Sequence, residues 1–156
     1  MLSGEPYTLV LVIHSTSVPG TQGIFRSGSS SNGIWLWVVS SSRLWGRHAN
    51  VDSPSSGSGP TITAGWHRLV RVWDRQQVRQ YVDGLRTNTV AVTAIGGWTI
   101  YRWGWQFTGS EGLDEAYVPF FGTFGVAWDD GRSPDAARAL TANAPSCVAV
   151  RWRHPG

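Results

Sequence analysis

Apolar and polar residues alternate along most of this chain in short runs, which is the period-two pattern of strands that bury one face. Clusters of Gly, Pro, Ser and Asn interrupt the runs every 10–15 residues or so (about one strand and its turn), as in an antiparallel sandwich. Residues 7–13 are apolar almost throughout, which is typical of a central strand. The predicted strands cover residues 7–15, 23–27, 33–40, 43–48, 67–73 with a lead-in from 61, 78–83, 87–95, 98–107, 120–128 and a closing strand at 147–152.

Local turn and cap chemistry adds two features to this pattern. Asp83-Gly84 follows a predicted strand and indicates a tight hairpin of the I′ type, in which both central residues have positive φ. Ser133 is a good helix N-cap, Pro134 suits the first helical position, and residues 136–142 are helix formers. We therefore predict an all-β, two-sheet antiparallel jelly-roll sandwich with one short C-terminal helix, forming a single domain over residues 1–156.

Composition narrows the class of protein. The 156 residues include 10 Trp, and alternation places Trp35 and Trp37 on one face of their strand, opposite Leu36 and Val38. The one cysteine, Cys147, excludes an intrachain disulfide. The apolar run at the N-terminus is too short for a signal peptide or a membrane span, so we expect a soluble protein made in the cytoplasm.

The net charge is +3, and every basic residue is Arg, because the chain contains no Lys. These arginines are scattered along the sequence, whereas a nucleic-acid-binding protein usually carries a dense basic stripe. The sequence therefore predicts neither a nucleic-acid partner nor a membrane partner.

No pattern of catalytic residues stands out. The chain has only three Glu, and the nearest approach to a paired-carboxylate site is Glu111 with Asp114 and Glu115, which follow a turn signal and are interpreted as a solvated loop. The four His are scattered, and His67 is interpreted as a half-buried structural residue. We expect no enzymatic activity, no catalytic residue and no cofactor.

Three segments in order resemble the laminin-G-like, concanavalin-A-like jelly roll. Residues 7–13 resemble its opening strand, residues 65–72 with 81–84 its central hairpin, and residues 121–128 with 133–143 its final strand and closing helix. Members of the family usually carry one more strand before the opening one. The resemblance thus leaves three alternatives for the place of that strand. The strand is lost and the edge is open, Val148–Trp152 takes its place, or a strand of another subunit does.

The resemblance also implies a candidate metal site, since many laminin-G domains hold one Ca²⁺ at the sandwich rim. Asp129-Asp130-Gly131 is the best acidic loop here, and Asp52 is a second candidate. Asp-Asp-Gly is ordinary turn chemistry, so we interpret it as a turn that leads into the predicted helix, and predict no metal site.

Exposed tryptophans are the best candidates for contact with a partner or a glycan, because sugar rings stack on aromatic faces. Trp98 follows two glycines, and Trp45 is flanked by Arg43 and Arg47. Arg102 is close to Trp98 in sequence. These five residues form the predicted binding set.

Short, free-standing domains of this family are common among bacteriophage structural proteins, and the Ser-Pro-Asp-Ala helix with an Asn before a proline is similar to theirs. The resemblance implies a capsid decoration (cement) protein on the virion surface, homo-oligomeric and bound to the major capsid protein. The alternative is a lectin-like module that binds glycans through exposed Trp. A glycoside hydrolase or lyase is a third hypothesis, disfavoured by the lack of a carboxylate motif.

Overall fold

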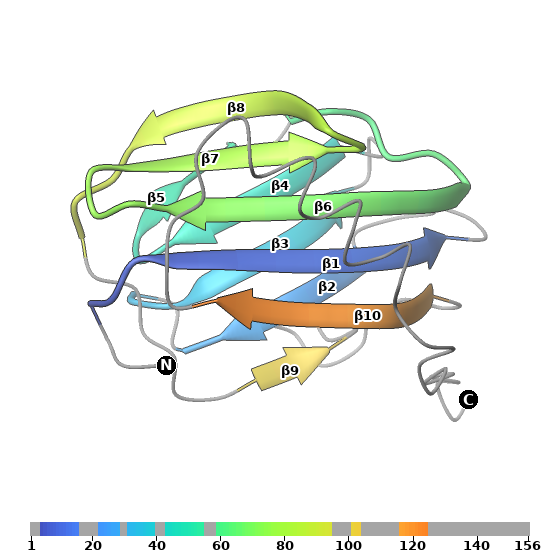
Figure 1. Ribbon diagram of the computed structural model, residues 1–156, viewed down its shortest axis with the longest axis horizontal. Coiled ribbons are helices and arrows are strands. Elements are labelled where there is room, and N and C mark those ends of the chain that lie inside the picture. Colours follow the sequence, from blue (N-terminus) through green and yellow to red (C-terminus); the bar gives the residue numbers. More distant parts are fainter. Residues whose placement is uncertain are drawn as a thin grey trace.

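The computed structural model describes residues 4–15, 22–28, 31–39, 43–54, 59–94, 101–103 and 116–124. These residues form two antiparallel five-stranded sheets that lie face to face (Figure 1). The predicted all-β, two-sheet sandwich is thereby confirmed. The predicted helix at 133–142 and the closing strand at 147–152 lie outside the described residues.

Each sheet brings together strands that are distant in sequence. The first sheet has the order β10 (Ala116–Phe124), β1 (Tyr7–Ser15), β6 (Gly65–Trp73), β7 (Gln77–Val82) and β8 (Leu85–Ala91). The second sheet has the order β5 (Val51–Asp52), β4 (Arg43–His48), β3 (Ile34–Val39), β2 (Gln22–Ser27) and β9 (Tyr101–Trp103).

The core lies between the sheets, where every second side chain of a strand points inward. β1 contributes Leu9, Leu11 and Ile13, each at most 1 % exposed. The buried cluster facing them from the second sheet includes Ile24, Ile34, Leu36, Val38 and Leu44. The alternation predicted for residues 33–40 is confirmed, because Leu36 and Val38 belong to this cluster and their neighbours Trp35 and Trp37 do not.

The opening strand is central, as its apolar sequence predicted. β1 pairs with β6 from Tyr7↔Trp73 to Ser15↔Gly65, and with β10 on its other side. β1 therefore presents no open edge. Among the described strands, the edges of the first sheet are β8 and β10, and those of the second are β5 and β9.

The central hairpin has the predicted turn. Asp83 and Gly84 have φ values of 52° and 89°, and Val82 pairs with Leu85 directly across the turn. Positive φ at both positions gives the turn a twist that matches the strands it joins. The hairpin fixes Asp83 at one end of the first sheet.

Some strand boundaries differ from the prediction. The last strong strand was predicted over residues 120–128; β10 covers Ala116–Phe124 and so starts four residues earlier, while residues 125–128 lie outside the described residues. The returning strand was predicted over 87–95, whereas β8 covers Leu85–Ala91. In the second case the two-residue turn lets pairing resume at once after Gly84, two residues earlier than predicted. Within the described ranges, no helix is long and apolar enough to cross a membrane.

Candidate binding surface

The outer face of the second sheet carries a tryptophan–arginine cluster, which consists of Arg26, Trp35, Trp37, Trp45 and Arg47. Trp37 and Trp45 are paired across β3 and β4, and their rings stack with centroids 4.5 Å apart. Trp35 meets Trp37 edge-on, with centroids 4.7 Å apart. These are the two ring arrangements that the aromatic quadrupole favours.

Arginines lie over two of these rings, of which Trp35 is buried and Trp45 half-buried. The guanidinium carbon of Arg26 is 4.5 Å from the Trp35 ring centroid, and that of Arg47 is 5.4 Å from the Trp45 centroid. Both distances are within the range of cation–π attraction. Arg47 Nε also donates a hydrogen bond of 2.7 Å to Asp52 Oδ1, so its charge is already paired.

The predicted binding set is distributed unevenly around this cluster. Trp45 is half-buried, with one ring face against Trp37. Arg43 is exposed, and its Nη1 donates a hydrogen bond of 3.0 Å to the carbonyl of Gly59. Arg102 is in β9, paired with Arg26 in β2, but its side chain lies outside the described part of the chain, as does the whole of Trp98. The structure brings Trp45 and Arg47 together, and the binding role of the set stays a prediction.

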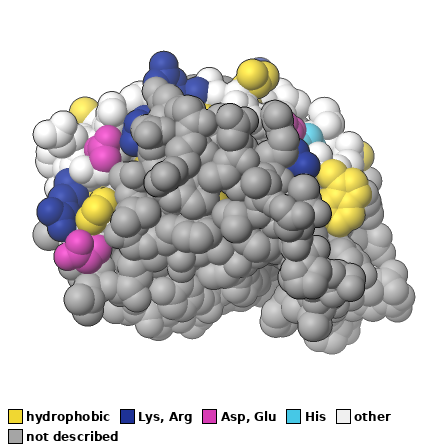
Figure 2. All heavy atoms as spheres, in the orientation of Figure 1, with side chains coloured by type: hydrophobic (Ala, Val, Ile, Leu, Met, Phe, Trp, Pro, Cys, Tyr) yellow, Lys and Arg dark blue, Asp and Glu magenta, His cyan; other side chains and the backbone are white. Residues whose placement is uncertain are grey.

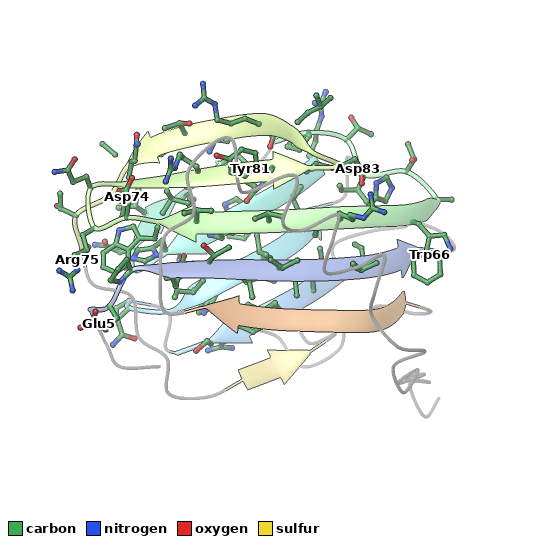
Figure 3. The ribbon with its side chains drawn as sticks, viewed as in Figure 1. Glu5, Trp66, Asp74, Arg75, Tyr81 and Asp83 are labelled. Carbon is green, nitrogen blue, oxygen red and sulfur yellow. The ribbon has the colours of Figure 1, made fainter. Side chains whose placement is uncertain are left out.

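A second surface lies at one end of the first sheet, and we call it the Trp66 rim: Thr63, Trp66, His67, Arg68 and Asp83. Trp66 is 57 % exposed. Asp83 accepts a hydrogen bond of 2.8 Å from the backbone N–H of Arg68 and lies 2.8 Å from His67 Nδ1. Figure 3 shows Trp66 and Asp83 at the same end of the sheet, opposite the end that carries Arg75 and Glu5.

The polar groups of the Trp66 rim are held in place while remaining accessible. His67 Nε2 is 3.1 Å from the carbonyl oxygen of Thr63, so the ring lies between two oxygen acceptors. The Asp83 side chain is 47 % exposed, and the predicted half-buried state of His67 is confirmed. Figure 2 shows hydrophobic, basic, acidic and histidine side chains exposed together at the right-hand end of this view.

Sequence reasoning missed Trp66 as a contact residue and used it only for the family resemblance. The signal was present, because alternation places Trp66, the second residue of β6, on the face opposite Leu69 and Trp73. Strand alternation alone does not reveal that Trp66 lies at the end of the sheet, where its ring stays exposed.

The described residues contain no group of three or more His, Cys, Asp or Glu side chains that could hold a metal ion. Asp52, one of the calcium candidates, forms the ion pair with Arg47. Asp129, Asp130 and the acidic segment around Glu111 lie outside the described ranges.

A polar centre is buried between the sheets. The Tyr7 hydroxyl is 2.9 Å from His48 Nδ1, and His48 Nε2 is 2.9 Å from the carbonyl oxygen of Ala94. Burial, reinforced by the nearby charge of Arg71, lowers the pKa of His48 to about 3. His48 is therefore neutral, with Nδ1 accepting from the tyrosine and Nε2–H donating to the carbonyl.

No protein-family model matches this chain, and no curated protein matches it at a significant level. Solved structures of low sequence identity do resemble it. The binding domain of botulinum neurotoxin DC, solved in complex with SialylT, has a TM-score of 0.64 at 14 % identity, over 88 % of this chain and 36 % of that one. The botulinum neurotoxin serotype G binding domain has a TM-score of 0.65 at 10 % identity, over 88 % and 37 %.

A sialidase from Trypanosoma rangeli is similar too, with a TM-score of 0.65 at 16 % identity, over 87 % of this chain and 22 % of the enzyme. This chain thus spans little more than a third of the binding domains and less than a quarter of the sialidase. Such likenesses concern one part of each larger protein. At these identities they establish the fold that the chain shares with them, a β-sandwich of the jelly-roll kind.

Proposed function

We propose that this chain is a non-catalytic, lectin-like domain that binds glycan at the Trp66 rim. The observation that carries the proposal is a tryptophan that is 57 % exposed at the same end of the sheet as the Asp83 carboxylate, which is held by a backbone hydrogen bond. An exposed indole supplies a flat apolar face for a sugar ring, and a fixed carboxylate accepts hydrogen bonds from sugar hydroxyls. The two groups together fix both the plane and the orientation of a ligand.

The structural neighbours support the same class of function. One neurotoxin binding domain was solved with SialylT, and the cell entry of botulinum neurotoxin type C is described as dependent on two ganglioside molecules. These statements concern the toxins. This chain matches 36 % of each of those two chains, so the likeness supports glycan binding as the class of function to test first, and the site itself is inferred from the residues of the rim.

Replacing Trp66 by alanine is expected to weaken glycan binding at least tenfold, which corresponds to about 1.4 kcal/mol, because the stacking face is lost. Binding would be measured by isothermal titration with a hit from a glycan panel. Asp83→Asn is expected to weaken binding as well while keeping the hairpin, since Asn accepts positive φ in a I′ turn.

Two matched controls are available. Leu85 is 74 % exposed, so Leu85→Ala removes an exposed apolar side chain outside the rim. Arg75→Ala changes the charge at the opposite end of the sheet. Both variants are expected to bind like the parent. Equal affinity of the parent and Trp66→Ala would reject the Trp66 rim as the glycan-binding site. The titration would then be repeated with Trp45→Ala.

A second proposal concerns a role as a decoration protein of a bacteriophage capsid, made in the host cytoplasm and displayed on the virion surface. The edge strand β8 favours it: β8 pairs with β7 on one side, and no described strand pairs with the other. An open edge can add a strand from a neighbouring subunit, either the major capsid protein or a second copy of this chain. Weak contacts suffice in a lattice, where valency multiplies them.

Co-sedimentation with undecorated phage heads at low and high salt tests this role. Saturable binding at one fixed stoichiometry per capsomer is the expected result, and a decrease at high salt would measure the contribution of the arginines. Absence of binding at both salt concentrations would reject the capsid role and leave the glycan proposal intact.

A further inference from the structure

A row of polar side chains crosses the inner face of the first sheet, where core residues are expected. Arg71 in β6 pairs with Gln80 in β7, and Gln80 pairs with Asn88 in β8. Arg71 and Gln80 are each 1 % exposed, whereas Asn88 at the sheet edge is half-buried. The row therefore runs from the edge of the sandwich into its interior.

The second sheet is shaped to receive the guanidinium of Arg71. A Cβ atom on Gly46 would lie 2.4 Å from Arg71 Nη1 and 2.5 Å from the carbonyl oxygen of Ser53. Only glycine leaves this space open. Arg71 Nη1 donates to that Ser53 carbonyl and, over 2.8 Å, to Gln80 Oε1.

The donors of this row outnumber its acceptors. Arg71 Nε, Arg71 Nη2 and Gln80 Nε2 are buried and have no hydrogen-bond partner. The ion pairs found among the described residues involve other arginines and His67. A buried arginine normally has a carboxylate beside it, because an unpaired charge in the interior costs several kcal/mol, in order of magnitude.

The neighbouring groups do not supply the missing negative charge. The Tyr7 hydroxyl interacts with the Arg71 side chain, but burial raises the pKa of Tyr7, so the phenol stays protonated and supplies no negative charge. Burial lowers the pKa of Arg71, yet a guanidinium keeps its proton in proteins. His48 is neutral. A positive charge and three unpartnered N–H-bearing atoms thus lie together in the core.

We propose that Arg71 and Gln80 bind a small monovalent anion of the halide class, with chloride as the physiological candidate, inside the sandwich. A halide accepts several hydrogen bonds and donates none, which is what a site made of donors requires. A water molecule would also bring two hydrogens of its own, whereas a halide offers only acceptor capacity to these donors.

Thermal unfolding in sodium chloride and in sodium gluconate at equal ionic strength tests the site. We expect the melting temperature to rise saturably with chloride, by about 3–6 °C at ten times the dissociation constant. Arg71→Met is expected to abolish the difference between the two salts. Arg75→Met, which removes an exposed arginine, is expected to keep it.

Crystals grown in sodium bromide give a second measurement that needs no variant, in case Arg71→Met does not fold. Anomalous density is expected next to Arg71 Nε and Nη2 and Gln80 Nε2. Density at that position without an anomalous signal would identify water and overturn the proposal. Equal melting temperatures in the two salts for the parent protein would overturn it as well.

Discussion

Replacing Trp73 by alanine is expected to lower the free energy of unfolding by about 3–5 kcal/mol. Trp73 is 1 % exposed at the end of β6, and its ring centroid lies 4.5 Å from that of His48 and 6.0 Å from that of Tyr7. Its indole N–H donates a hydrogen bond of 2.8 Å to the carbonyl of Val92. Alanine would leave a cavity and an unpaired carbonyl in the same place.

The strand that carries Trp73 also provides its control. Trp66 belongs to β6 as well but is 57 % exposed, so Trp66→Ala is expected to change stability by less than about 0.5 kcal/mol. Trp73→Phe keeps most of the apolar volume and loses the donor, which separates packing from hydrogen bonding. Urea denaturation followed by fluorescence measures all three variants. Equal losses for the two alanine variants would contradict the assigned burial.

Acidification from pH 7.5 to pH 5 is expected to cost about 2 kcal/mol of stability through His48 alone. Its folded-state pKa is lowered from 6.5 to about 3, first by burial and then by the charge of Arg71. Between these two values the unfolded chain binds a proton that the folded chain does not. The stabilisation is therefore complete above pH 6.5 and is lost as the pH falls toward 3.

His48→Gln isolates this contribution, because glutamine has no proton to gain in this range. The parent should lose about 2 kcal/mol more than this variant between pH 7.5 and 5, in paired urea titrations. If His48→Gln kept the full pH dependence of the parent, the proton-linked loss would have to arise at another group.

Local chemistry explains why much of the sandwich could be predicted. Alternation in residues 33–40 and the apolar run of residues 7–13 report burial directly, because strand side chains point to opposite faces. The Asp83-Gly84 turn depends on two adjacent residues that tolerate positive φ. In each case the determining residues are neighbours in sequence, so no knowledge of strand pairing is needed.

Features that depend on cross-strand partners could not be predicted in this way. Arg71 occupies an inward position that a polar residue normally avoids, and the space left by Gly46 and the hydrogen bond to Gln80 on the adjacent strand accommodate its guanidinium. The half-buried state of Trp45 follows from its pairing with Trp37 in the adjacent strand. The Trp66 rim likewise depends on Asp83, which lies in the turn between β7 and β8 and reaches the rim only through the pairing of β6 with β7.

The buried polar contacts also have a mechanical consequence. The contact from Tyr7 to His48 joins one sheet to the other, and Arg71 and Asn88 of the first sheet both donate to Ser53, which directly follows β5 of the second. Apolar side chains alone would allow the layers to slide, since dispersion has little directionality, whereas hydrogen bonds between fixed atoms resist shear. Force applied at the Trp66 end of β6 would therefore load both layers together rather than peel one sheet from the other.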